Sequence, residues 1–240
     1  MSSTAPQIRL EAALPEALGR IATTPGVYAA LWCGSASRGE ANEYSDLDIH
    51  ALVTGDQRWR SHFTVHGNGQ PVPVEVFYNP AGQISSLIAQ EDSASVAMYA
   101  HGRVLLHHPD LTGLMREAQA RYEAGRTPRS VTAEQRFALI EEVMDGRAQV
   151  DDPAHVLTAM TAVSRRMMPL LYASRGWWDV KREHWLSDLE RRDAGVATDL
   201  RRLLEARDGR SRQAALEALT LHLTGNLAYE DGRSTPQPVA

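Results

Sequence analysis

The sequence contains a single cysteine, Cys33, and no long apolar run. One cysteine cannot form an internal disulfide, which fits a reducing compartment. No stretch approaches the ~20 apolar residues that a membrane-spanning helix needs. The opening residues, Met-Ser-Ser-Thr-Ala-Pro-Gln, lack the basic and apolar regions of a signal peptide. We therefore expect a cytoplasmic protein that has no membrane partner.

Positive charge is also in short supply. The chain has 25 Lys+Arg against 30 Asp+Glu, which gives a net charge of −5. Proteins that bind nucleic acids non-specifically are usually strongly basic, so nucleic acid is a disfavoured partner. Even the arginine-rich stretch 179–212 holds nine Lys+Arg against eight Asp+Glu. The nine histidines show no spacing typical of a zinc site.

The 240 residues suffice for one large domain or two small ones. In the first half, strand patterns alternate with helical ones, and Gly67-Asn68-Gly69 predicts the turn of a hairpin. Pro71 and Pro73 place the start of the strand after this turn at an edge or a bulge. We predict helices at 6–24, 37–42, 81–100 and 109–124, and strands at 27–33, 46–54, 63–66, 72–78 and 104–106.

From Thr132 onward the pattern is almost entirely helical, and Thr132 with Gln135 resembles a capping box. We predict helices at 133–150, 153–174, 179–192, 197–207 and 211–223. Strands that precede a run of helices indicate an α+β fold. The expected organisation is a small mixed-sheet domain at 1–126, a helical domain at 127–230 and a flexible tail at 231–240.

Two aspartates open the predicted strand 46–54. Asp46 and Asp48 stand two residues apart, so both carboxylates are expected on one face of the strand. Like charges at this separation repel each other, and a cation between them removes that penalty. Oxygen ligands suit a hard ion such as Mg²⁺. Glu75 interrupts the apolar run Val72-Pro-Val-Glu-Val-Phe and is expected to face away from the core. If its strand lies beside the first, three carboxylates converge, which is the arrangement for two metal ions acting at phosphorus.

Gly34 and Ser35 follow the predicted strand 27–33. Glycine lets the backbone approach a ligand closely, and a helix N-terminus presents free N–H groups to an anion. Ser35 can add its hydroxyl group. The turn and the acids thus address two parts of one ligand: phosphates on the turn, metal-bound oxygens on the carboxylates.

The whole motif reads Gly34-Ser35, three residues, Gly39, five residues, then Ser45-Asp46-Leu-Asp48. This spacing resembles the signature of the nucleotidyltransferase superfamily related to DNA polymerase beta. The acidic charge and the helical second half look most like the aminoglycoside nucleotidyltransferases and their relatives. The resemblance implies transfer of a nucleoside monophosphate, typically AMP from ATP or another nucleoside triphosphate, to a hydroxyl group with release of pyrophosphate.

The resemblance also implies roles for particular residues. Asp46, Asp48 and Glu75 would be catalytic acids that bind two Mg²⁺ ions, and Gly34 and Ser35 would cradle the triphosphate. Arg38 and Ser45 of the same motif are further candidates for nucleotide binding. Relatives with a helical second domain often send a lysine to the triphosphate; Lys181 is the best candidate for this role, against the simpler reading of a solvated lysine. Trp177 and Trp178 fit core packing better than a ligand pocket.

The acceptor and the general base stay open at this point. A small hydroxylated acceptor, such as an aminoglycoside-like antibiotic, suits the acidic composition because a negative cleft attracts cations. The alternatives are a protein or tRNA acceptor, as in toxin–antitoxin nucleotidyltransferases, and a catalytically idle nucleotide-binding protein. Glu75 is the first candidate for the base, followed by Glu91 and Asp92. The oligomeric state cannot be read from the sequence. Cys33 is expected to be a buried, small apolar side chain.

Overall fold

The structure, a computed structural model, describes residues 4–229. The chain divides into two compact units, Met1–Gly125 and Arg126–Ala240. This division falls one residue before the end of the predicted first domain. The first unit contains a mixed five-stranded sheet with helices, and the described part of the second is helical, which confirms the α+β class. The predicted tail 231–240 lies outside the described residues.

The sheet of the first unit has the strand order β3-β4-β2-β1-β5. Its central strands β1 and β2 follow the two strongest strand patterns of the sequence closely. The bounds are β1 Val27–Cys33, β2 Leu47–Val53, β3 Trp59–Gly67, β4 Gln70–Asn79 and β5 Arg103–Leu106. Among these strands, β2 and β4 form the one parallel pair, and the other neighbours are antiparallel.

The hairpin β3–β4 turns at Asn68 and Gly69, which have φ angles of 52° and 77°. Two consecutive residues with positive φ form the tight turn that matches the twist of a hairpin, and Asn-Gly is its preferred sequence. Pro71 and Pro73 pair with β3, whereas the pairing of β4 with β2 begins only at Val74. The prolines therefore lie where β4 has a single neighbour, as predicted, and their missing N–H groups interrupt no central ladder.

Helix α1 (Ala5–Ala22) covers one face of the sheet. Its side chain Leu10 packs with Trp32 of β1 and Ile49 of β2 in a continuous apolar core. Helix α1 begins at Thr4, whose hydroxyl accepts a hydrogen bond from the N–H of Gln7. The approach is close, because a Cβ atom at Gly67 would lie 1.9 Å from the carbonyl oxygen of Arg9.

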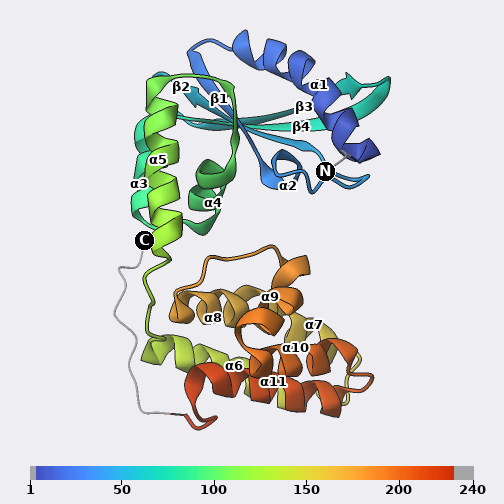
Figure 1. The fold of residues 1–240 in the computed structure, drawn as a ribbon. Helices are drawn as coiled ribbons and strands as arrows, with labels where there is room; N and C mark the ends of the chain where they lie inside the picture. Colours follow the sequence, from blue (N-terminus) through green and yellow to red (C-terminus); the bar gives the residue numbers. More distant parts are fainter. Residues whose placement is uncertain (1–3, 230–240) are drawn as a thin grey trace. The chain divides into compact units, whose positions relative to one another are not determined.

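The other face of the sheet carries helices α3, α4 and α5 (Figure 1). Their bounds are Ala81–Ala89, Ser93–His101 and Pro109–Ala124. The prediction of helix over 81–100 is wrong at its centre, because the chain breaks at Glu91, where φ is 58°. The predicted helix 37–42 is also wrong. The helical turn α2 spans Gly34–Ser37 instead, and the residues after it form a loop.

The described part of the second unit is built from helices around its own apolar core. The predicted capping box of Thr132 and Gln135 is confirmed at the start of α6. The predicted helix 153–174 contains a π-helical stretch, Val163–Met167, which ends two residues before Pro169. Proline lacks the N–H group that an α-helix needs, and a wider turn accommodates that loss. The helices are α6 Ala133–Ala148, α7 His155–Ala162, α8 Met168–Arg175, α9 Trp185–Arg192, α10 Ala194–Glu205 and α11 Gly209–Thr224.

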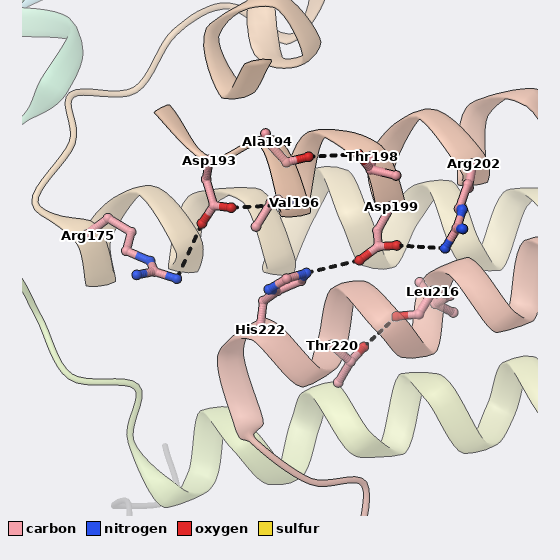
Figure 2. A network of polar contacts seen from close by, with 10 residues as sticks. All are labelled: Arg175, Asp193, Ala194, Val196, Thr198, Asp199, Arg202, Leu216, Thr220 and His222. Atoms are coloured by element: carbon pink, nitrogen blue, oxygen red, sulfur yellow. Dashed lines mark hydrogen bonds and ion pairs between the residues drawn. The ribbon is translucent and has the colours of Figure 1, made fainter. Parts of the chain in front are cut away.

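Polar contacts join the later helices of this unit (Figure 2). The Nε2 atom of His222 on α11 is 3.0 Å from Oδ2 of Asp199 on α10. Asp193 accepts a hydrogen bond from the N–H of Val196 and so caps α10, and it also pairs with Arg175 at the end of α8. Asp193, Asp199 and Arg175 thus have structural roles, because they connect neighbouring helices of this unit. None of the helices within 4–229 combines the length and the apolar character that a membrane crossing requires.

Candidate functional site

A row of side chains crosses four strands on the face of the sheet opposite α1. Cys33 of β1 pairs with Asp48 of β2, Asp48 pairs with Glu75 of β4, and Glu75 pairs with His62 of β3. Cross-strand partners project to the same side of a sheet, and neighbouring strands lie ~4.8 Å apart. The sheet therefore brings Asp48 and Glu75 together from positions 27 residues apart in the chain.

The alternation of the strands fixes this face. Leu47 and Ile49, on either side of Asp48, are fully buried in the core under α1. Val74 and Val76 flank Glu75 in the same way. Because apolar burial directs these neighbours to one side, the two acids are directed to the other.

Gly34 lies against the carboxylate of Asp48. Its φ angle is +78°, and a Cβ atom at this position would lie 2.4 Å from Oδ2 of Asp48. Only glycine satisfies both conditions, since other residues are strained at this φ and would collide with the aspartate. The predicted phosphate turn and one of the predicted metal ligands are therefore in direct contact. The turn continues into the short helix α2, whose N-cap residue, Cys33, provides no side-chain cap.

The loop between α2 and β2 is closed by its own hydrogen bonds. The N–H of Asn42 donates to Oγ of Ser45 at 2.9 Å, and the N–H of Ser45 donates to the carbonyl of Asn42 at 3.1 Å. Ser45 thus has a structural role in the loop that leads to Asp46. Arg38 is held back on the turn, because its guanidinium donates to the carbonyl oxygen of Gly34 and pairs with Glu40. Asp46 is half-buried and lies one residue before β2.

Glu75 already has a cationic partner. Its Oε1 atom is 2.6 Å from Nη2 of Arg60 on β3. Within residues 4–229, no group of three or more His, Cys, Asp or Glu side chains is arranged to hold a metal ion. Thus the backbone brings two acids together, while the carboxylate of Glu75 contacts an arginine. No motif in the sequence distinguishes Arg60; it lies near Glu75 because it is the register partner of Phe77, two residues further along β4.

His50 lies two residues after Asp48 on β2, on the same face of the sheet, and is buried. Its ring lies between Phe77, at 4.9 Å between centroids, and Tyr99 of α4, at 5.6 Å. In the described part of the chain, neither ring nitrogen of His50 nor the hydroxyl of Tyr99 has a hydrogen-bond partner. Burial lowers the pKa of His50 to about 4, so the imidazole is neutral near pH 7. The sequence signal was available: His50 continues the two-residue alternation of Asp46 and Asp48.

Cys33 is buried, which confirms the sequence prediction. Its sulfur lies 3.8 Å from the carbonyl oxygens of Leu31 and Met98. Burial and the nearby negative charge of Asp48 raise the pKa of the thiol. The cysteine is therefore a poor nucleophile and acts as a small side chain in the wall beside Asp48.

The two alternative general bases have structural partners. Glu91 is 7% exposed and pairs with Arg121 of α5 at 3.4 Å. Asp92 caps α4 by accepting a hydrogen bond from the N–H of Ser95 at 2.9 Å. Both carboxylates thus stabilise the junction between α3 and α4. Glu75 also contacts an arginine, but it lies in the row with Asp48; its role as the base stays a prediction.

The remaining candidates belong to the second unit. Lys181 is exposed and precedes the short 3₁₀ helix Arg182–His184, so it does not begin the helix predicted at 179–192. The Trp177 ring packs edge-on against Tyr172 at 5.7 Å. Trp178 is 9% exposed. Both tryptophans are thus largely packing residues, as expected, whereas the proposed reach of Lys181 to a triphosphate stays a prediction.

The donor set of the row fits a hard divalent cation. Asp48 and Glu75 offer only oxygen atoms on adjacent strands, and Asp46 lies two residues before Asp48 in the chain. Oxygen-only donors are the set that Mg²⁺ prefers. The glycine at position 34 lets the backbone of the turn pack directly against the Asp48 carboxylate, where a larger side chain would collide with it. The arrangement suits chemistry on a phosphate that is held beside a divalent cation.

Comparisons with known proteins leave the family undecided. No protein-family model matches the chain, and no curated protein sequence matches it. Among solved structures, the chain is similar to a nucleotidyltransferase-like protein from Exiguobacterium sibiricum 255-15, with 14% sequence identity over 88% of this chain and 74% of that chain. The TM-score is 0.49, which is too low to assign a family.

Proposed function

We propose that this chain is a Mg²⁺-dependent nucleotidyltransferase that transfers a nucleoside monophosphate, AMP from ATP in the first instance, to a hydroxyl group of a small acceptor. The observation that carries the proposal is the in-register pairing of Asp48 with Glu75, directly beside the Gly34 turn. The full motif, with its Gly-Ser and Ser-Asp-Leu-Asp elements at the spacing of the polymerase beta superfamily, supports the same assignment.

In this proposal each group has a defined role. The acceptor oxygen bonds to the α-phosphorus of the nucleotide, the bond from that phosphorus to the bridging oxygen breaks, and pyrophosphate leaves with that oxygen. Glu75 takes the hydroxyl proton. Asp46, Asp48 and Glu75 would hold the cation, which when bound would supply Lewis-acid stabilisation of charge on the phosphate.

The phosphates lie against the glycine turn. Gly34 lets the backbone come close to them, and Ser35 donates its hydroxyl. Arg38 is close enough to the turn to exchange its contact with the Gly34 carbonyl for a phosphate oxygen. Ser45 contributes by fixing the loop that leads to Asp46. Lys181 remains a proposed triphosphate contact, carried only by the family resemblance.

We propose a cationic, hydroxylated acceptor of the aminoglycoside type. The net charge of −5 favours a positively charged small molecule, because a negative site raises its local concentration. No residue between 126 and 229 identifies the acceptor more closely.

The test is a transfer assay with the purified full chain, Mg²⁺, α-labelled nucleoside triphosphates and a panel of hydroxylated amines. Label transferred to an acceptor, with release of pyrophosphate, is the expected result. Asp48→Asn is expected to abolish transfer and to keep the fold, because it removes one of two adjacent negative charges. Labelled protein or RNA in a cell extract, without a labelled small molecule, would replace the acceptor class. No transfer to any acceptor by a folded protein would refute the proposal.

A further inference from the structure

Arg60 forms an ion pair with Glu75, the third acid of the proposed site. Its Nη2 atom lies 2.6 Å from Oε1 of Glu75, and its guanidinium carbon lies 4.8 Å from the centroid of the Phe77 ring. Arg60 and Phe77 are register partners on β3 and β4. The arginine therefore reaches from the edge strand across the aromatic ring to the carboxylate, and two separate contacts hold it in place.

This contact sets a fixed positive charge beside the pair of acids. A guanidinium stays protonated throughout the accessible pH range. It contacts an oxygen of Glu75 that a divalent cation would also use. A cation bound near Asp48 and Glu75 therefore meets both a like charge and an acid that already has a partner.

We propose that Arg60 is an internal counter-ion of Glu75 that competes with the divalent cation and thereby sets the cation affinity of the site. The inference rests on the proposed function, since it takes Glu75 as a cation ligand. Arg60 acts through Glu75, so it is a positioning residue. When the cation arrives, the guanidinium leaves the carboxylate and keeps its contact with the Phe77 ring.

The size of the effect follows from exposure. The side chain of Arg60 is 60% exposed and that of Glu75 is 30% exposed, so solvent screens the pair. Exposed ion pairs are worth at most about a fivefold change in an equilibrium constant. Removing the charge of Arg60 is therefore expected to tighten cation binding by up to about fivefold.

The experiment measures binding of Mn²⁺ alone to the full chain by electron paramagnetic resonance, without nucleotide or acceptor. Arg60→Met removes the charge and keeps a long side chain over Phe77. Arg58→Met is the matched control, because it removes the same charge from an exposed position two residues away in the chain. Both substitutions are repeated in a Glu75→Gln background, which removes the acid for which Arg60 competes.

The expected result is binding that is tighter by up to about fivefold in Arg60→Met, a smaller change in Arg58→Met, and no effect of Arg60→Met when Glu75 is glutamine. A gain in affinity that disappears in the Glu75→Gln background cannot come from a general disturbance of the fold. If the parent binds Mn²⁺ through Asp48 but Arg60→Met binds Mn²⁺ no more tightly than the parent, Arg60 does not compete with the cation. The proposed function is not affected by that result. If no variant binds Mn²⁺ and no transfer is detected, the proposed function fails and this inference fails with it.

Discussion

His50 provides a sharp test of how this face of the sheet is packed. In the unfolded chain, the imidazole titrates near its ordinary pKa of 6.5, whereas burial lowers the pKa in the folded state to about 4. Between these two values the unfolded state binds a proton that the folded state does not, so acidification favours unfolding. The contribution of His50 to the free energy of unfolding should fall by about 2 kcal/mol between pH 7 and pH 5, and by about 3 kcal/mol below both pKa values.

The substitution His50→Leu removes the titrating group and keeps a similar volume. At pH 7 it should change the free energy of unfolding by less than about 1 kcal/mol, because both ring nitrogens lack partners within the described chain and an apolar side chain leaves nothing unsatisfied. Between pH 7 and pH 5, the free energy of unfolding of the parent should fall by about 2 kcal/mol more than that of the variant.

The assay is urea denaturation of the full chain, followed by circular dichroism at several pH values. His66→Leu is the control, since His66 is an exposed histidine of the same sheet. Only the difference between His50→Leu and the parent matters, because other groups titrate equally in both. If the free energy of unfolding falls equally with pH in the parent and in His50→Leu, the imidazole is not held neutral in the folded state. The description of His50 as a buried, neutral side chain would then be wrong.

Further variants test the turn and the helical unit. Gly34→Ala should destabilise the fold by about 3 kcal/mol and abolish transfer, whereas Gly39→Ala, with similar φ but open space around it, should cost only about 1 kcal/mol; thermal unfolding and the transfer assay compare them. Equal effects would mean that the contact with Asp48 is unimportant. Asp188→Leu should cost about 3 kcal/mol in urea denaturation, because Asp188 accepts hydrogen bonds from Tyr172 and two arginines. A cost no greater than that of a substitution at an exposed aspartate would contradict this role.

The elements that depend on local patterns could be predicted from the sequence. Strand β1 was expected over the residues that form it, and the turn at Asn68 and Gly69 follows from backbone conformations that these residues favour. The pairing of Asp48 with Glu75 was expected only on the condition that their strands are neighbours. The alternation of apolar residues with each acid predicts the face that the acid takes, whereas the choice of neighbouring strands depends on the whole sheet.

The errors have physical causes that lie outside local patterns. The predicted helix 37–42 fails because Asn42 and Ser45 bond to each other's backbone, which competes with helix formation. The predicted helix 81–100 breaks at Glu91, which pairs with Arg121 from a distant helix. A partner 30 residues away leaves no periodic signal in the sequence.

The site shows the same division. The motif from Gly34 to Asp48 could be recognised from spacing alone, because its chemistry is concentrated in a short stretch. Arg60 could not, because its importance depends on its register opposite Phe77 and its reach to Glu75. Single charged residues on an exposed strand are usually solvated. Only its contact with Glu75 distinguishes Arg60 from such a residue.

The parallel contact between β2 and β4 has a consequence for how the protein can fail. Because side chains alternate along a strand, a slip of one residue would turn Glu75 toward α1 and bring a valine next to Asp48. A slip of one residue would therefore disrupt the apolar layer and the acid pair together. If Mn²⁺ binds at this pair, the stoichiometry of binding would report the fraction of molecules whose strands β2 and β4 are paired in the observed register.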